Sequence, residues 1–306
     1  MAELFIHVGY PKCASTFLQK RLLPKQSEIC FIDSPQYHNA LLKRYYPCGG
    51  EQKRIEALKH LSSIVTASNL PVVMSNENLC MPSSWLDTHR ARQNNKFSWH
   101  ESNELIKAYF PKARILIVVR NQQDWICSWY QERIKRVETK SLSQLLSSSL
   151  FMDDILPSLC YTKVIEEYSK LFSAKSVKVI LFEDMIKDLG CFFSAIGING
   201  NTVKNEKVRS SISHVSLLMR RNTNKILSFL LDRGASFETI EQSVFKLLKE
   251  LYSYDFIIKK LSNNFAKPNK YNLSLTQEII SILKTDNAKL HNLLGKNFHN
   301  YGYLLP

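Results

Sequence analysis

Short apolar segments of strand length alternate with amphipathic segments along the first two thirds of the chain. Strands are predicted at residues 4–8, 29–32, 70–74, 113–119 and 177–182. Helices are predicted between and after them, at 16–23, 51–67, 102–110, 122–136, 161–172 and from 183 to about 197. The segment 113–119 is the most apolar in the chain, and its residues 115–119 form a continuous apolar run, which is typical of a central parallel strand covered on both faces. The alternation therefore predicts a three-layer α/β fold, with a central parallel sheet and helices on both faces.

Polar segments separate these elements. Residues 35–47 are rich in Pro and Tyr, and residues 141–149 form a Ser-rich connection. The polar stretch 81–100 is predicted to be a long loop, and it is a candidate lid or substrate contact.

From residue 213 onward the chain is predicted to be mainly helical, at 215–231, 240–261 and 275–293, with an aromatic tail. No linker of disordered composition and no internal repeat is visible. We therefore expect a single domain over 1–306, with an α/β nucleotide-binding core at 1–212 and a helical C-terminal part at 213–306.

The first predicted strand leads into the loop Gly9-Tyr-Pro-Lys-Cys-Ala-Ser-Thr16 and then into a helix. The glycine and the proline bend the chain, and we expect Ser15 or Thr16 to cap the helix while its free N–H groups point into the loop. A strand, a turn of small residues and an open helix N-terminus form a site for a phosphate-like anion, to which Lys12 adds a mobile positive charge. The alternative is an ordinary strand-to-helix turn with a surface lysine.

This loop is not of the magnesium-binding type G-x-x-x-x-G-K-[ST], in which a hydroxyl residue follows the lysine. Lys12 comes early and is followed by Cys13-Ala14, so Ser15 and Thr16 occupy the place of the lysine–serine pair. The sequence therefore still favours a nucleotide, but not an ATP–Mg²⁺ enzyme.

Four segments follow predicted strands, and so lie at the carboxyl ends of the sheet. These segments are residues 9–16, 75–78, 120–128 and 182–184. Ligands of such folds bind beyond the carboxyl ends of the strands, so we expect the four segments to converge on one crevice.

The composition adds a charge and a compartment to this picture. A formal charge of +14 and a pI near 9.4 favour anionic partners, namely nucleotides, acidic or sulfated sugars, nucleic acid or anionic lipid. No signal-peptide pattern precedes the first strand and the longest apolar runs are strand-sized, so we expect a cytoplasmic protein without a transmembrane segment. The seven cysteines are scattered and lack metal-ligand spacing, and we expect reduced thiols. Cys13 is expected to be a small packed thiol, the alternative being a reactive thiol beside Lys12.

With these motifs the chain resembles the sulfotransferases that use 3′-phosphoadenosine 5′-phosphosulfate (PAPS). The loop at 9–16 resembles their 5′-phosphosulfate loop, although Cys13-Ala14 replaces the family's Ser-Gly or Thr-Gly. Arg120-Asn-Gln-Gln-Asp-Trp-Ile-Cys-Ser-Trp-Tyr130 resembles their 3′-phosphate motif, in which an arginine ends a strand and a serine follows on the next helix. Phe182-Glu-Asp-Met185 resembles the segment after the next core strand. Asp286-Asn287 through Tyr301-Gly-Tyr303 resembles the C-terminal end of bacterial carbohydrate sulfotransferase-like proteins.

The resemblance implies a P-loop-like sulfotransferase fold that binds PAPS, releases 3′,5′-ADP and needs no metal. It assigns the 5′ end of PAPS to Gly9, Pro11, Lys12, Cys13, Ala14, Ser15 and Thr16, and the 3′-phosphate to Arg120 and Ser128. Phe182 is a further residue that it implies in cofactor binding. Arg209 and Ser210 precede a helix where family members carry a loop that closes over the 3′-phosphate. The forked guanidinium of Arg120 suits a dianionic phosphate, the alternative being a structural pair with Asp124 or Glu183.

The acceptor hydroxyl needs a general base, and the transferring group needs a cation. Lys12 is the candidate cation. By resemblance to the heparan-type members, Glu77 is the first candidate base and His100 the second; the alternative for Glu77 is a loop carboxylate paired with a lysine. His7 is expected to be a core residue, because it lies inside a strand.

The predicted function is transfer of a sulfuryl group from PAPS to a hydroxyl of a carbohydrate or glycolipid acceptor made in the cytoplasm, with an acidic saccharide suiting the basic chain. Peripheral contact with a membrane is compatible with this function.

The competing functions are a nucleotide-dependent kinase on a related sheet, which the missing G-K-[ST] disfavours, and a basic nucleic-acid-binding protein. The latter lacks a clustered basic stripe and a reader motif in this sequence, so nucleic acid is not expected as a partner. Trp125 and Trp129 lie at helical spacing, and we expect them in the core rather than on an adenine ring.

Overall fold

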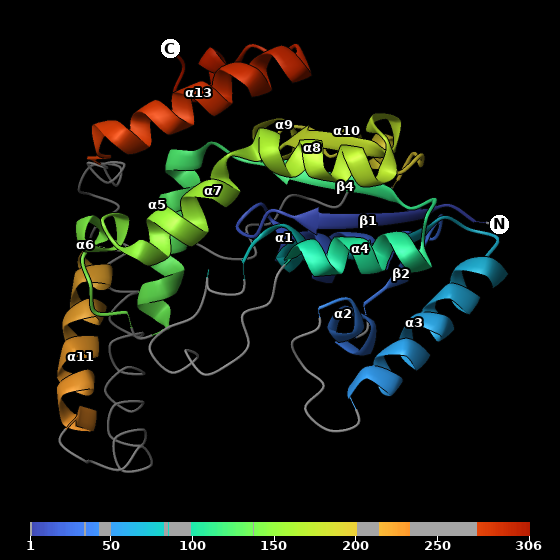
Figure 1. Ribbon diagram of the computed structural model, residues 1–306, viewed down its shortest axis with the longest axis horizontal. Helices are drawn as coiled ribbons and strands as arrows, with labels where there is room; N and C mark the ends of the chain where they lie inside the picture. Colours follow the sequence, from blue (N-terminus) through green and yellow to red (C-terminus); the bar gives the residue numbers. More distant parts are fainter. Residues whose placement is uncertain are drawn as a thin grey trace.

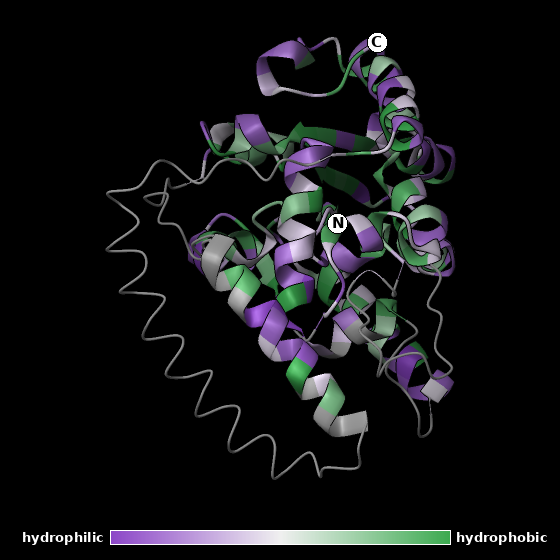
Figure 2. Cartoon of the chain, turned by 90° about the vertical axis from the view of Figure 1, so that its left-hand side faces the viewer, coloured by the Kyte–Doolittle hydropathy of each residue, from purple (hydrophilic) through white to green (hydrophobic). Residues whose placement is uncertain are grey.

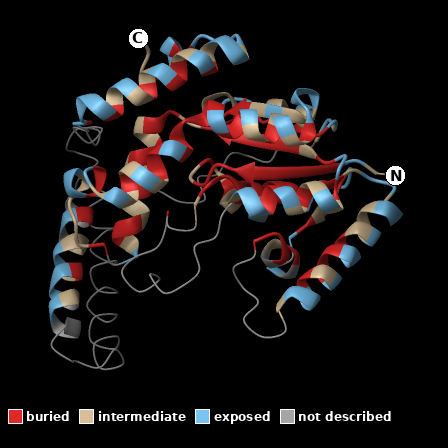
Figure 3. Cartoon of the chain, viewed as in Figure 1, coloured by how far each residue is buried: buried red, intermediate tan, exposed pale blue. Residues whose placement is uncertain are grey.

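The computed structural model describes residues 2–33, 35–42, 50–82, 85, 99–136, 138–200, 214–232 and 274–306. In these ranges, five parallel strands form one sheet in the order β2-β3-β1-β4-β5 (Figure 1). The strands are β1 (Leu4–Gly9), β2 (Cys30–Ile32), β3 (Val72–Ser75), β4 (Arg114–Val119) and β5 (Val177–Leu181). The central strands are buried along nearly their whole length, whereas the surrounding helices have one buried and one exposed side (Figure 3). The predicted parallel sheet is confirmed.

Helices cover both faces of this sheet. The connection from β1 to β2 runs in the opposite direction across the sheet from those that join β3 to β4 and β4 to β5. Because parallel crossovers are right-handed, the opposite directions place their helices on opposite faces. On one face α4 (Trp99–Tyr109) packs against α8 (Tyr161–Phe172). On the other, α1 (Ser15–Phe17) continues as a π-helical turn, Leu18–Leu22. Helix α10 (Gly190–Ala195) packs against the sheet, where the ring centre of Phe192 lies 6.1 Å from that of His7 in β1.

The remaining helices complete the layers. They are α2 (Pro35–Leu41), α3 (Gly50–Ala67), α5 (Gln122–Lys135), α6 (Leu142–Leu146), α7 (Leu156–Leu159), α9 (Phe182–Met185), α11 (His214–Asp232) and α13 (Gln277–Leu294). Short 3₁₀ turns lie at Leu23–Lys25, Glu77–Cys80, Ala174–Ser176 and Phe298–Tyr301, and a further π-helical segment at Leu150–Ile155. Seen along the strands in Figure 2, most of these helices carry both hydrophilic and hydrophobic residues. This is the amphipathic pattern of elements that lie between a core and water.

Three predictions of helices and connections are wrong. The polar stretch at 35–47 contains α2, which begins with a proline at its first turn and turns Tyr37, Ala40 and Leu41 toward the core. The Ser-rich connection contains α6, which a capping box between Ser141 and Gln144 stabilises. The helix predicted from 183 to 197 is two helices, α9 and α10. The predicted helix at 240–261 and most of the predicted loop at 81–100 lie outside the described residues.

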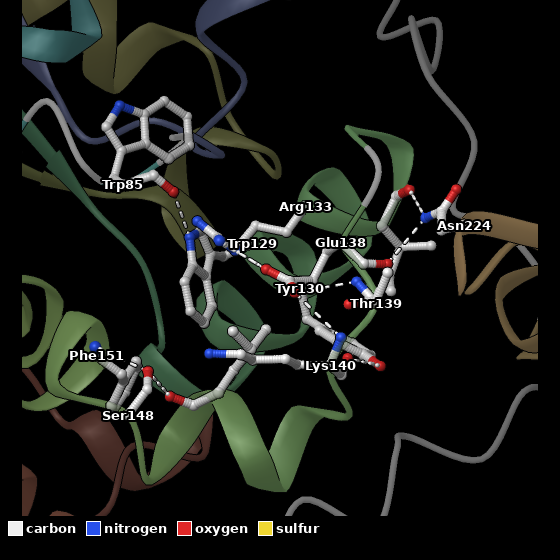
Figure 4. Close-up of polar contacts among 12 residues, drawn as sticks. Trp85, Trp129, Tyr130, Arg133, Glu138, Thr139, Lys140, Ser148, Phe151 and Asn224 are labelled. Atoms are coloured by element: carbon white, nitrogen blue, oxygen red, sulfur yellow. Dashed lines mark hydrogen bonds and ion pairs between the residues drawn. The ribbon is translucent and has the colours of Figure 1, made fainter. Parts of the chain in front are cut away.

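The helical C-terminal part is tied to α5 at both ends of that helix. At the end of α5, Asn224 of α11 donates hydrogen bonds to the carbonyl oxygens of Ile134 and Glu138, both at 2.9 Å (Figure 4). Glu138 forms a buried ion pair with Arg133 at 2.6 Å, and its second oxygen accepts from the N–H groups of the two following residues. A buried ion pair is tolerated only when its polar atoms are satisfied in this way. The start of α5 is held by α13, as described below.

Candidate active site

The carboxyl ends of β1, β3, β4 and β5 bring the four predicted segments to one edge of the sheet. The chain leaves β1 toward one face and leaves its neighbours β3 and β4 toward the other. Such a reversal opens a crevice at the strand ends. The loop at 9–16 lies at this point, where the N–H of Tyr10 still donates to the carbonyl of Val118 in β4 at 2.8 Å.

The loop itself contains two left-handed residues. Lys12 (φ 68°) and Ala14 (φ 62°) are left-handed, and Cys13 between them is not. An alternation of this kind is typical of loops whose successive N–H groups turn toward one concave side and bind an anion. Position 9 (φ 148°) also requires a glycine, because a Cβ atom there would lie 2.0 Å from the Sγ atom of Cys80. The replacement of the family's glycine by Ala14 has therefore not removed the left-handed conformation at that position.

The prediction that Ser15 or Thr16 caps the first helix is wrong. Helix α1 begins at Ser15, its N-cap is Ala14, and no side chain accepts a hydrogen bond there. Because the left-handed Ala14 already turns the chain into the helix, the two hydroxyl residues occupy the first helical positions. Their N–H groups have no carbonyl one turn earlier within the helix and face the loop.

Two donors, one just after β4 and one in α5, hold the loop by its carbonyl oxygens. The indole Nε1 of Trp125 donates to the carbonyl of Pro11 at 2.7 Å, and Nη1 of Arg120 donates to the carbonyl of Lys12 at 2.9 Å. With its carbonyl groups directed toward these donors, the loop keeps its N–H groups for a ligand. Trp125 is fully buried, as is Trp129, so both belong to the core as predicted.

Lys12 is paired with a residue that the sequence did not single out. Its Nζ lies 3.0 Å from Oε2 of Glu132, and the two side chains are only 18% and 12% exposed. Glu132 also lies 3.9 Å from Lys135 and 3.5 Å from Arg136. Burial alone would raise the pKa of Glu132, but Lys12 and the two other cations hold that pKa below its usual value. One carboxylate thus neutralises the lysine of the anion loop.

The guanidinium of Arg120 lies over the ring of Phe182. Its Cζ lies 4.7 Å from the centre of the Phe182 ring, and its Nε is buried without a hydrogen-bond partner among the described residues. In the same part of the chain, neither Asp124 nor Glu183 lies within 4.0 Å of Arg120 as an ion pair, so the alternative role of Arg120 in a structural pair is not supported. Ser128 is half-buried on α5, one turn before Glu132 and on the same side of the helix. Arg209 and Ser210 lie outside the described residues.

Glu77 follows β3 and begins the 3₁₀ turn there. Its partner is the amide of Gln19, whose Nε2 donates to Oε2 of Glu77 at 2.6 Å. The same amide lies 3.1 Å from the carbonyl and 3.2 Å from the hydroxyl of Ser75. The carboxylate is therefore held by a neutral amide from the helix that follows the anion loop, and the alternative pairing with a lysine is not found among the described residues.

The two histidines lie in different environments. His7 is fully buried in β1, where its Nδ1 lies 2.8 Å from the hydroxyl of Ser75, and burial lowers its pKa to about 4. It is a neutral core residue, as predicted. His100 has a side chain that is 57% exposed, and its contacts are a hydrogen bond with Glu167 of α8 and the ring of Trp99. The structure does not bring His100 to the loop or to Glu77 through any contact among the described residues.

Cys13 is fully buried, and burial raises the pKa of its thiol to about 12. It is a packed thiol rather than a reactive one. The six cysteines in the described ranges are free. In those ranges no group of three or more His, Cys, Asp or Glu could hold a metal ion. No helix among the described residues is both long enough and apolar enough to cross a membrane.

Glu132 and Gln19 contact predicted site residues but were not predicted from the sequence, and Glu183 was named only as an alternative partner of Arg120. A signal was available for Glu132, since it lies four residues after Ser128 on the same helix. No local signal distinguishes Gln19, because its pairing with Glu77 depends on the neighbouring positions of β1 and β3.

The described residues form an α/β protein with a parallel sheet, a tight loop with left-handed residues after its first strand and an arginine after β4 that holds this loop. Residues 3–224 match a family model described as the sulfotransferase domain, and the chain therefore belongs to the sulfotransferase family. The motif-based assignment is confirmed. A crystal structure of a sulfotransferase from Alicyclobacillus acidocaldarius is 16% identical in sequence, with a TM-score of 0.47, and the match covers 76% of this chain and 92% of that one. No curated protein matches the sequence.

Proposed function

We propose that this sulfotransferase uses PAPS and transfers its sulfuryl group to a hydroxyl of a carbohydrate or glycolipid acceptor. The observation that carries the proposal is the hydrogen bond between the side chain of Arg120 and the main chain of Lys12. Arg120 donates to the carbonyl of Lys12 at 2.9 Å, so the lysine of the 5′ loop and the arginine proposed for the 3′-phosphate form one unit. A cofactor with an anionic group at each end of one nucleoside suits such a pair.

Each residue of the unit has a separate task. The N–H groups of the nest and of the first turn of α1 would bind the 5′ end, and the guanidinium of Arg120 would bind the 3′-phosphate with its planar fork. PAPS supplies a sulfuryl group on a good leaving group, the 5′-phosphate of 3′,5′-ADP. Lys12 would leave Glu132 and neutralise the charge that grows on the bridging oxygen, without a metal.

Glu77 is proposed as the general base. As the acceptor oxygen bonds to sulfur and the bond from sulfur to the 5′-phosphate oxygen breaks, Glu77 would take the acceptor proton. The contact with Gln19 supports this role, because it holds Oε2 of the carboxylate and leaves Oε1 for the acceptor. His100 stays the second candidate base, although its known contacts are with Trp99 and Glu167.

The acceptor class rests on the resemblance and on charge. A chain with a formal charge of +14 would attract an acceptor that is already acidic, such as a polysaccharide or a glycolipid precursor made in the cytoplasm. Peripheral contact with an anionic membrane is compatible with the same charge.

Binding measurements test the proposal. Stabilisation against heat by 3′,5′-ADP without metal, and little or none by ATP–Mg²⁺ or RNA, is expected from a PAPS enzyme. Stabilisation by ATP–Mg²⁺ instead would favour a kinase, and stabilisation by RNA would favour a nucleic-acid-binding protein.

For the chemical step, Lys12→Ala should lower the turnover of folded protein by orders of magnitude. A turnover within about threefold of wild type would remove Lys12 from the mechanism.

A further inference from the structure

Glu183 lies beside Arg120 but does not pair with it. It follows Phe182, whose ring lies under the guanidinium. Burial raises the pKa of Glu183, and Arg120 counters part of that rise, so the two charges interact. An ion pair between them would occupy the fork that a phosphate needs. Something in the fold therefore has to hold this carboxylate away from the arginine.

Both oxygens of Glu183 are occupied by other donors. The backbone N–H of Asn121 donates to Oε1 at 2.8 Å. The hydroxyl of Tyr303, three residues from the C-terminus, lies 3.3 Å from Oε2. Burial and the carboxylate of Glu183 raise the pKa of Tyr303, so its hydroxyl keeps the proton and acts as the donor.

The C-terminal tail holds Tyr303 rigidly in this place. The ring is 5% exposed and stacks on Phe298, with 4.7 Å between the ring centres. The following residue, Leu304, accepts a hydrogen bond through its carbonyl from Nδ2 of Asn287 at 3.0 Å. Asn287 also exchanges amide hydrogen bonds with Gln122, the first residue of α5, at 2.6 and 3.2 Å.

The tail also contacts the residue next to Arg120 directly. The side chain of Asn121 caps α5 with its oxygen and donates with its nitrogen to the carbonyl of Tyr301 at 3.1 Å. These contacts join the chain around Arg120 to a segment that lies beyond the residues matched by the family model, 3–224.

We propose that Tyr303 is a positioning residue that keeps Glu183 from pairing with Arg120, and so leaves the guanidinium for the 3′-phosphate of the cofactor. This inference rests on the proposed function of Arg120. When the hydroxyl of Tyr303 is removed, one oxygen of Glu183 loses its donor, and the carboxylate can turn to the nearest cation.

The test is Tyr303→Phe, which keeps the ring stacked on Phe298 and removes only the hydroxyl. The affinity for 3′,5′-ADP, measured by titration calorimetry, should fall about tenfold, the scale of one hydrogen bond to a charged group. The affinity for 5′-AMP should not change, because this ligand has no 3′-phosphate. Tyr301→Phe is the matched control: it removes a hydroxyl of the same tail that bonds to Asp184, and both affinities should stay at the wild-type value.

A rescue separates positioning from simple destabilisation. Glu183→Gln added to Tyr303→Phe should restore the affinity for 3′,5′-ADP, because a neutral amide cannot form an ion pair with Arg120. Equal losses for both nucleotides, or no recovery in the double variant, would overturn the inference.

A second measurement does not depend on the cofactor. The coupling between Arg120→Ala and Glu183→Gln, obtained by urea denaturation, should be larger in the Tyr303→Phe background than in the wild type. If wild-type protein binds neither nucleotide, the proposed function fails, while a larger coupling still supports the role of Tyr303. An unchanged coupling contradicts it.

Discussion

The replacement of Ala14 by glycine should stabilise the protein, which is the reverse of the usual effect of this change. Ala14 has φ 62° and ψ 19°, in the left-handed region where an L side chain crowds the following carbonyl oxygen. That conformation costs roughly 1–2 kcal/mol for alanine and little for glycine. Glycine also gives the unfolded chain more conformational freedom, which lowers the free energy of unfolding by about 0.4–1 kcal/mol. The centres of these two ranges differ by about 0.8 kcal/mol, which is the expected net gain in the free energy of unfolding.

Urea denaturation followed by circular dichroism measures this gain, supported by a rise in melting temperature of about 2 °C for a chain of this size. The matched control is Ala288→Gly in the middle of the long helix α13. There glycine should cost about 0.5–1 kcal/mol, because the helical conformation suits alanine. If both variants lose stability to a similar extent, Ala14 is not held in a left-handed conformation, and the account of the anion nest fails with it.

Three further predictions concern the site. Arg120→Ala should weaken binding of 3′,5′-ADP far more than binding of 5′-AMP in calorimetric titrations; similar losses for both would mean that Arg120 acts mainly by holding the carbonyl of Lys12. Glu77→Gln should lower the rate of sulfuryl transfer by about 10²–10⁴ while leaving cofactor affinity intact, because glutamine cannot accept a proton at neutral pH. His100→Ala, assayed beside it, should be near wild type, and the opposite pattern would move the base to His100. Glu132→Gln should tighten binding of 3′,5′-ADP several-fold, since Lys12 would no longer have to leave a carboxylate; weaker binding would show that Glu132 orients Lys12 for the ligand.

The sheet and the anion loop could be predicted because their signals are local. The continuous apolar run at 115–119 is typical of a strand that is covered on both faces, and β4 is such a strand. The spacing of Gly9, Lys12 and the helix start likewise describes one turn of chain. Helix α6 was not predicted, because the serines of its stretch indicated a connection. In the structure one of these serines forms the capping box that stabilises α6.

The partners of the site residues depended on the tertiary structure. Lys12 meets Glu132, Glu77 meets Gln19 and Glu183 meets Tyr303, across 120, 58 and 120 positions of sequence. Each pairing follows from the strand order and register and from the packing of helices on the sheet. For a polar residue in a helix, the sequence shows only that it lies away from the apolar side of that helix. The long-range packing of the elements decides which charge such a residue meets. It therefore also decides whether Lys12 and Arg120 are free for a ligand or held by a carboxylate.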